Sequence, residues 1–308
     1  MKFVKLSIVV GTYNRLASLQ KCLDALYKDI HIDHEILVID AGSTDGTLEY
    51  LRHLPDIHLV CDGKLIGQAQ SFNRVLKVLE GDYVCWLSDD NLVQDGMLDL
   101  AVSVLEKDSR IGMVALKVKD ITGPYTDAPY IGGIWESGIL NCNQGLLRTA
   151  LLRDLGGFSE DFRDYGIDAD LTTRVLLAGY RVVYTKRVAI HHHRDHETVG
   201  WASKEDRARR LDEGKALYRQ KYPFMIEKNA VPKDLTASIF RIFSIGFFLI
   251  AKISRNTKSK QFISSIIRDL VNVSSAAFIS KWDLIINFFQ PYYLVQKIPE
   301  KSRAKWNL

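Results

Sequence analysis

The stretch from Gly81 to Leu92, Gly-Asp-Tyr-Val-Cys-Trp-Leu-Ser-Asp-Asp-Asn-Leu, indicates how this chain folds. Its apolar run over Tyr83–Leu87 predicts a buried strand, which ends in two adjacent acids, Asp89 and Asp90. Acids at the carboxyl end of a strand in an α/β sheet lie in the crevice where ligands bind. Carboxylate oxygens there suit Mg²⁺ or Mn²⁺ carrying a diphosphate. A simpler alternative is that the two acids cap the following helix.

Short apolar runs alternate with segments of helical spacing along the first two hundred residues. Strands are expected over residues 6–10, 35–39, 57–61, 83–87, 113–119 and 181–184. Helices are expected over residues 18–27, 47–54, 67–79, 94–106, 146–155, 169–178 and 205–222. This alternation predicts an α/β fold with a Rossmann-like, mostly parallel sheet flanked by helices. Polar loops follow the strand ends, and residues 122–137 predict a further long loop.

The composition is that of an ordinary globular protein of 308 residues, with 47% hydrophobic and 25% charged residues. Four cysteines, Cys22, Cys61, Cys85 and Cys142, show no metal-binding spacing and fall in predicted core segments. A reducing compartment is therefore the better expectation. The amino terminus lacks the layout of a signal peptide, so we expect a cytoplasmic protein.

The last part of the chain differs in charge from the rest. Lys233 to Leu308 holds 12 basic and 4 acidic residues, whereas residues 1–232 are mildly acidic. Three apolar helices are expected there, over Thr236–Ile253, Gln261–Ile279 and Trp282–Val295. Basic apolar helices favour contact with an anionic membrane surface, and the alternative is a helical subdomain that packs on the core. The apolar content argues against a nucleic-acid partner.

Five segments in order resemble the family 2 glycosyltransferases, which have the GT-A fold. They are Ser7–Arg15, Val38–Thr47, Leu87–Asn91, Gly156–Phe162 and Tyr165–Leu171, and the resemblance covers roughly residues 5–195. It implies a catalytic domain over residues 1–232, with a nucleotide-sugar half to about residue 120, an acceptor half to 232, and the helical tail beyond. The implied reaction is inverting, metal-assisted transfer from a nucleotide-diphosphate sugar, with UDP preferred. The implied acceptor is a hydroxyl of a saccharide or lipid-linked saccharide, as in polysaccharide or glycolipid biosynthesis.

The resemblance assigns donor-binding roles to residues at the first strand ends. Thr12 and Tyr13 would lie against the base, although such residues also suit simple turns. Asp40 would accept a hydrogen bond from uracil or its ribose, but Ala41 stands where many relatives have a second acid. Arg74 would reach the diphosphate or base, or lie on a solvated helix face.

The metal site implied by the resemblance consists of the acid pair and a histidine. Asp90 would ligate the divalent ion, and Asp89 would contact the ribose or a metal-bound water. Relatives place a histidine near the segment His191–His193, and we favour His191 as the one that faces the ion.

The acceptor side is implied by residues further along the chain. Asp168 is the expected catalytic base, with a helix N-cap as its alternative, and Ile167 replaces a glutamate common in relatives. Trp135 and Gln144 are expected to bind the acceptor, and Asp170 is expected either to bind it or to be structural.

Two rival functions remain open from the sequence. One is transfer of a sugar to a polyprenyl phosphate, and the other is an inactive scaffold that only binds a nucleotide sugar. The departures at Ala41 and Ile167 keep the second rival open. The basic tail places the enzyme of the leading hypothesis as a peripheral protein on the inner face of the cytoplasmic membrane.

Overall fold

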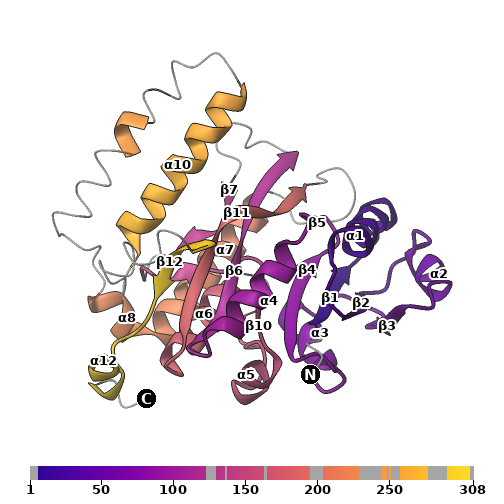
Figure 1. The fold of residues 1–308 in the computed structure, drawn as a ribbon. Helices are drawn as coiled ribbons and strands as arrows, with labels where there is room; N and C mark the ends of the chain where they lie inside the picture. The colour runs from indigo at the N-terminus through magenta and orange to yellow at the C-terminus, as the bar shows by residue number, and fades with distance from the viewer. Residues whose placement is uncertain are drawn as a thin grey trace.

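The computed structural model describes residues 6–122, 130–135, 137–162, 165–194, 204–228, 244–247, 250, 257–276 and 290–305 (Figure 1). The first elements are β1 (Leu6–Thr12), α1 (Leu16–Asp29), β2 (His34–Asp40), α2 (Thr47–Arg52), β3 (Ile57–Cys61), α3 (Gln68–Val75), β4 (Tyr83–Ser88), β5 (Asn91–Val93), α4 (Met97–Lys107) and β6 (Ile111–Thr122). Next come β7 (Tyr130–Ile131), β8 (Gly133–Ile134), β9 (Leu140–Asn141), β10 (Gly145–Arg148), α5 (Thr149–Asp154), α6 (Ile167–Leu177) and β11 (Arg181–His193). The last are α7 (Lys204–Lys221), α8 (Pro223–Lys228), α10 (Thr257–Ser275), β12 (Tyr292–Gln296) and α12 (Glu300–Lys305).

One large sheet organises the described residues, with the strand order β12-β11-β6-β10-β4-β1-β2-β3. Strands β4, β1, β2 and β3 run parallel, so their carboxyl ends meet at one edge. Strand β5 pairs with β11, β7 pairs with β6, and β8 and β9 form a separate small ribbon. The parallel half of the sheet confirms the strands expected at residues 6–10, 35–39, 57–61 and 83–87.

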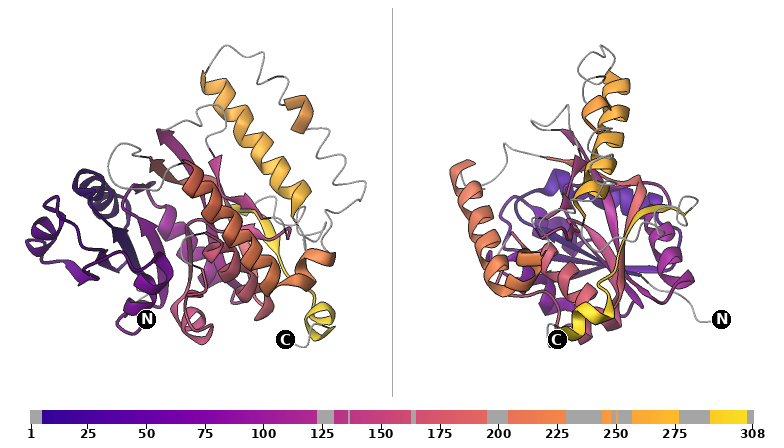
Figure 2. Two further views of the ribbon diagram at one scale, coloured as in Figure 1. Left: turned by 180° about the vertical axis from the view of Figure 1, so that it is seen from behind. Right: turned by 90° about the vertical axis from the view of Figure 1, so that its left-hand side faces the viewer.

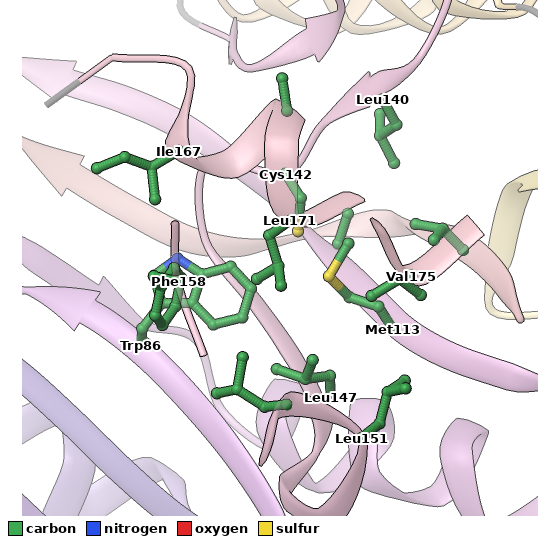
Figure 3. Close-up of a cluster of buried hydrophobic side chains, with 14 of the residues drawn as sticks. Trp86, Met113, Leu140, Cys142, Leu147, Leu151, Phe158, Ile167, Leu171 and Val175 are labelled. Carbon is green, nitrogen blue, oxygen red and sulfur yellow. The ribbon is translucent and has the colours of Figure 1, made fainter. Parts of the chain in front are cut away.

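Both faces of the sheet are buried, because apolar side chains alternate along the strands. On β1, Val9 faces one core, whereas Ile8 and Val10 face the other. Helices α1, α2 and α4 cover the face of Ile8. Helices α3, α5, α6 and α7 cover the face of Val9, where Figure 3 shows Trp86 among the packed side chains. This two-sided burial explains the continuous apolar strands in the sequence.

The middle of the sheet departs from the expected parallel arrangement. The sequence predicts one helix over residues 146–155, but Gly145–Arg148 forms β10, and α5 begins only at Thr149. Strand β10 lies antiparallel between β4 and β6. A segment this short, with only Leu146 and Leu147 as large apolar residues, fits a buried strand or a buried helix equally well, and only its neighbours decide between them.

The carboxy-terminal region also differs from the expected separate tail. Tyr292–Gln296 was expected to lie mostly in a helix, but it forms β12 and pairs antiparallel with β11. Helix α10 confirms the helix expected near residues 261–279, and it lies beside β6 and β11 in Figures 1 and 2. Most of the expected helix at 236–253 and residues 282–289 lie outside the described residues. Within the described part, no helix is both long and apolar enough to cross a membrane.

A buried ion pair fixes α10 to the sheet. Lys117 of β6 is only 1% exposed, and its Nζ lies 2.7 Å from Asp269 Oδ1 of α10. The ammonium also donates to Ser265 Oγ at 3.0 Å and lies over the rings of Tyr130 and Tyr293. Burial lowers the pKa of Lys117, and the Asp269 carboxylate opposes that shift. A buried ion pair therefore holds helix α10 against the central sheet.

We predict that Lys117→Met lowers the free energy of unfolding by about 2–4 kcal/mol, because it leaves Asp269 partly buried without its counter-charge. Lys119→Met is the matched control, since Lys119 Nζ donates only to Gln261 Oε1 on the same helix. Urea denaturation of the full chain measures both changes. Equal midpoints for the two variants would contradict this account of the buried pair.

Candidate active site

Three loops at the carboxyl edge of the parallel strands are tied together by side-chain hydrogen bonds. Asn14, after β1, has a φ of 51°, and its Oδ1 accepts from the backbone N of Thr44 at 2.6 Å. Its own backbone N donates to Ser43 Oγ at 2.8 Å. Gly42 has a φ of 92°, and a Cβ there would lie 2.5 Å from the carbonyl oxygen of Gly63. The loops after β1, β2 and β3 therefore form one fixed wall.

Asp40 presents a buried acceptor with no protein partner. The residue is 1% exposed, and its Oδ2 accepts from the backbone N of Gly42 and Ser43, each at 3.0 Å. Among the residues that the structure describes, its Oδ1 has no hydrogen-bond partner. Buried carboxylate oxygens are nearly always satisfied, so this one points to a donor supplied by a ligand. Thr12 is the strand neighbour of Asp40, and Tyr13 follows it.

Arg74, expected at the donor site, lies on α3 and pairs with Asp62. Its Nη1 lies 2.6 Å from Asp62 Oδ1, and about half of the Arg74 side chain is exposed. Asp62 follows β3, and its backbone N donates to the carbonyl oxygen of Asp40 at 2.8 Å. The structure thus connects Arg74 to Asp40 indirectly, through the ion pair of Arg74 with Asp62.

The acid pair after β4 is buried and held by a cation that the sequence analysis left without a role. Arg15 Nη1 lies 3.0 Å from Asp89 Oδ1 and 3.0 Å from Asp90 Oδ2. Thr12 Oγ1 donates to Asp89 Oδ2 at 2.7 Å. Burial raises the pKa of Asp89 to about 6, with Arg15 opposing the rise. The pair shows no hydrogen bond to the following helix, so the helix-cap alternative is not what the geometry shows.

His192, not the favoured His191, contacts the acid pair. The three histidines lie within β11 rather than after it, so their side chains alternate between the two faces. His192 Nε2 lies 3.2 Å from Asp90 Oδ2, and its Nδ1 lies 2.7 Å from Asp120 Oδ1. Burial acts to lower the pKa of His192, but the two carboxylates raise it to about 9. Burial and the charge of Lys119 lower the pKa of His191 instead.

Asp120 on β6 fixes the ring of His192. Its second oxygen, Oδ2, accepts from Arg194 Nε at 3.0 Å. Burial acts to raise the pKa of Asp90, yet His192 and Arg15 outweigh it and lower that pKa. Asp90, His192 and Asp120 therefore form a chain of charged groups from β4 across β11 to β6.

The chemistry of this donor set fits a divalent cation. Two carboxylates and an imidazole are ligands that Mn²⁺ and Mg²⁺ accept, and a positive group, Arg15, already lies between the carboxylates. Within the described residues, however, no three His, Cys, Asp or Glu side chains converge as a preformed metal site. An ion shared by Asp89 and Asp90 would therefore need these side chains to rearrange.

Asp168 lies in the first turn of α6, where the preceding Gly166 is the N-cap, with a φ of 92° and no capping side chain. The expected alternative role of Asp168 as N-cap is therefore not what the structure shows. Burial raises the pKa of Asp168 to about 8. The Trp86 indole N–H opposes that rise in the pKa of Asp168. Its geometry falls short of a normal hydrogen bond. Because Trp86 belongs to β4, Asp168 lies beside the strand that ends at the acid pair.

Asp170, expected to bind the acceptor, is fully buried and committed to protein partners. Its oxygens pair with Arg174 Nε at 2.7 Å, Tyr222 Oη at 2.7 Å and Lys221 Nζ at 3.0 Å. These contacts favour the structural role expected for Asp170 over the acceptor-binding one. The network joins α6 to the end of α7 and the residue after it.

The contacts of Trp135 and Gln144 do not test their expected role in acceptor binding, which stays a prediction. The Trp135 ring packs edge-on against Tyr218, with 6.1 Å between ring centroids. Gln144 is buried, and its Oε1 accepts from Asn143 Nδ2 at 2.8 Å. Neither the Trp135–Tyr218 contact nor the Asn143–Gln144 hydrogen bond involves Asp168.

Sequence reasoning missed Arg15, Asp62, Asp120 and the choice of His192. Arg15 carried a signal, because it closes the polar run that follows the first strand. Asp120 had none, because nothing in its neighbourhood along the chain indicates a contact with residue 192.

Comparison with known proteins identifies the fold and the family. Residues 7–153 match the model of the family described as Glycosyl transferase family 2. EpsE of Bacillus subtilis (strain 168), assigned by its name to the glycosyltransferases, is 28% identical over 193 residues, which are 58% of this chain and 68% of EpsE. The N-acetylglucosaminyl-diphospho-decaprenol L-rhamnosyltransferase of Mycobacterium tuberculosis (strain ATCC 25618 / H37Rv) is 24% identical over 237 residues, 63% of this chain and 77% of that protein.

The chain carries a glycosyltransferase family 2 domain over residues 7–153. Two solved structures share its fold. S. aureus TarS 1-349 in complex with UDP-GlcNAc superposes with a TM-score of 0.52 and 16% identity, over 87% of this chain and 90% of that one. The mannosyltransferase PcManGT of Pyrobaculum calidifontis, in complex with GDP-Man and Mn²⁺, gives 0.51 and 20% identity, over 88% and 86%. The GT-A fold expected from the sequence is confirmed.

We predict that kcat/KM of this glycosyltransferase rises with pH and levels off above about pH 8. The carboxyl of Asp168 is protonated below its raised pKa of about 8, and only the carboxylate can accept a proton. Asp168→Asn should lower kcat by roughly 10²- to 10⁴-fold. A pH–rate profile of wild type checks the first statement.

Thermal denaturation supplies the control for Asp168→Asn. Because the fold favours the neutral carboxyl, wild-type stability falls as pH rises from the ordinary aspartate range through about 8, and the neutral amide avoids that loss. The variant should therefore melt no lower than wild type at pH 9. A flat pH–rate profile with a fully active variant would remove Asp168 from the catalytic step.

Proposed function

We propose that this glycosyltransferase moves a sugar from UDP to a hydroxyl of a saccharide or lipid-linked saccharide, with inversion at the anomeric carbon. The observation that carries the donor assignment is the unpaired, buried Oδ1 of Asp40. Uracil offers an N3–H donor in the plane of the ring, and cytosine has none at that position. The structural likeness to a protein solved with UDP-GlcNAc supports the same donor.

The donor site would extend from Asp40 along the strand ends to the acid pair. Strand β1 lies between β2 and β4, so Thr12 neighbours Asp40 on one side and its hydroxyl reaches Asp89 on the other. A nucleotide with its base at Asp40 would therefore place its diphosphate toward Asp89 and Asp90. A divalent ion held by these two acids would neutralise the departing diphosphate. The likeness to PcManGT, solved with GDP-Man and Mn²⁺, supports a metal-assisted reaction.

In the proposed transfer, the residues of this chain handle the proton and the orientation. Asp168 accepts the proton of the acceptor hydroxyl as that oxygen forms a bond to the anomeric carbon. The bond from the anomeric carbon to the diphosphate oxygen breaks, and UDP leaves with the electron pair. Attack opposite to the leaving group inverts the configuration. A base with a pKa near the working pH suits this step, because it is both available and strong enough.

We also propose that the acceptor brings the enzyme to the inner face of the cytoplasmic membrane. A relative that is named for a decaprenol-linked substrate supports a lipid-linked acceptor. Helix α10 carries Phe262, which is 69% exposed, next to the exposed Lys258. An exposed aromatic beside basic charge fits an anionic lipid surface better than it fits water.

We predict that UDP and UDP-sugars raise the melting temperature of the full chain, that Mn²⁺ enlarges the shift, and that CDP gives the smallest shift of the panel UDP, GDP, dTDP and CDP. Asp40→Asn should weaken UDP binding about 10- to 100-fold, because a hydrogen bond to a charged group is lost. Isothermal titration with UDP measures that change.

Asp95→Asn is the matched control, because Asp95 is 81% exposed and contacts only His31. The amide of Asp40→Asn keeps an oxygen for the backbone N of Gly42 and Ser43, so the fold should be preserved. A full-affinity Asp40→Asn variant would refute the base-binding role of this carboxylate.

We predict that the full chain co-sediments with vesicles containing phosphatidylglycerol, and less with vesicles of phosphatidylcholine alone. Phe262→Asp should release about half or more of the bound protein, since it replaces an apolar contact with a like charge to the lipid. Leu65→Asp is the control, because Leu65 is 59% exposed but lies in the loop between β3 and α3. Equal binding of both variants would argue against α10 as the contact surface.

A further inference from the structure

Arg15 occupies the position between the two acids that a shared cation would take. Its Nη1 is equidistant, at 3.0 Å, from Asp89 and Asp90. The remaining carboxylate oxygens are also engaged, since Thr12 donates to Asp89 Oδ2 and Asn91 donates to Asp90 Oδ1. The acid pair is thus fully satisfied by the protein itself.

We propose that Arg15 is an internal substitute for the divalent ion: it holds the acid pair closed in the metal-free protein, and the ion displaces it onto the donor diphosphate. This inference rests on the proposed metal-assisted, nucleotide-dependent function. It assigns to Arg15 two alternating partners, the carboxylates before donor binding and the phosphate oxygens after it.

The charges make the two occupants mutually exclusive. Asp89 and Asp90 carry two negative charges at most, and the Arg15 guanidinium already lies 3.0 Å from an oxygen of each. A divalent ion that joined both carboxylates while Arg15 stayed would lie within about 4 Å of a guanidinium, where like charges repel strongly in a partly buried site. The ion must therefore take the place of Arg15, not join it.

The geometry lets the side chain of Arg15 move while its backbone stays fixed. Arg15 is the N-cap residue of α1, and the next residue, Leu16, donates its backbone N to Asp45 Oδ2 at 3.0 Å. The same carboxyl group, through Oδ1, accepts from the backbone N of Thr47 at the start of α2. The start of α1 is therefore anchored, and the long arginine side chain, 12% exposed, extends from it to the acid pair.

A displaced Arg15 would find a better partner only when the donor is present. The guanidinium pairs with two phosphate oxygens at once, so the diphosphate can replace both carboxylate contacts. Metal binding alone would break the ion contacts of Arg15 with Asp89 and Asp90, and the donor diphosphate would supply contacts in their place. The ion and the nucleotide should consequently strengthen each other's binding through Arg15, beyond their direct contact.

The test is a titration of the full chain with Mn²⁺ alone, followed by electron paramagnetic resonance of the free ion. Arg15→Gln should bind Mn²⁺ at least about tenfold more tightly than wild type in the absence of nucleotide, because the competing cation is gone. Arg15→Lys keeps the charge and should stay close to wild type. The increase in Mn²⁺ affinity caused by UDP should be smaller in Arg15→Gln than in wild type.

Unchanged or weaker Mn²⁺ binding by Arg15→Gln would overturn the substitution model, while UDP binding by wild type would leave the proposed function intact. Absence of Mn²⁺ binding by wild type even with UDP, together with sugar transfer, would also overturn it, because Arg15 would then stay in place. If Arg15→Gln unfolds without metal, excess Mn²⁺ should restore its melting transition. Failure of Mn²⁺ to restore the fold would count against the proposal.

Discussion

Two carboxylates buried side by side at the end of β4 impose the strongest constraint on this molecule. Neither can keep its charge out of water without a positive partner, because isolated buried ions are costly. Arg15 reaches them from the loop after β1, and His192 reaches Asp90 from β11. Strands from both sides of β4 must therefore converge on the same edge. The rest of the site is built on this neutralisation.

The central position of β1 explains how the parts of the donor site come together. Its register places Thr12 beside Asp40 of β2 and Gly11 beside Ser88 of β4. The end of β1 thus lies between the wall that contains the unpaired Oδ1 of Asp40 and the acid pair. The sheet is buried on both faces, so these strand ends have little freedom to shift. A polar edge on a rigid, apolar sheet is the arrangement that holds ligand groups at fixed separations.

The sequence was sufficient for the parts of this site that depend on local pattern. Apolar runs that end in Asp40 and in Asp89 predicted both strand ends, because burial requires such runs and polar loops must follow them. The same reasoning failed for β10 and β12, since a short apolar segment takes its conformation from the strands beside it. It also failed for His192, because the three histidines differ only in which face of β11 they occupy.

Contacts between distant segments lay beyond any local pattern. From the sequence, Asp170 could bind the acceptor or be structural, and only the fold shows that Arg174, Lys221 and Tyr222 surround it. Arg15 and Asp120 acquired their roles in the same way. A charged residue in the sequence can be assigned a partner only when the two elements that carry the pair are known to meet.

Strand β6 joins the carboxy-terminal region to the site. Lys117 and Lys119 point to α10, where they meet Asp269 and Gln261. Asp120, the next residue, points to the opposite face and holds His192 against Asp90. Alternation along a single strand therefore connects α10 to the acid pair through adjacent residues. Removing α10 would leave Lys117, which is 1% exposed, without its counter-charge. Lys117 lies three positions before Asp120. Helix α10 is accordingly packed on the same strand that holds His192 through Asp120.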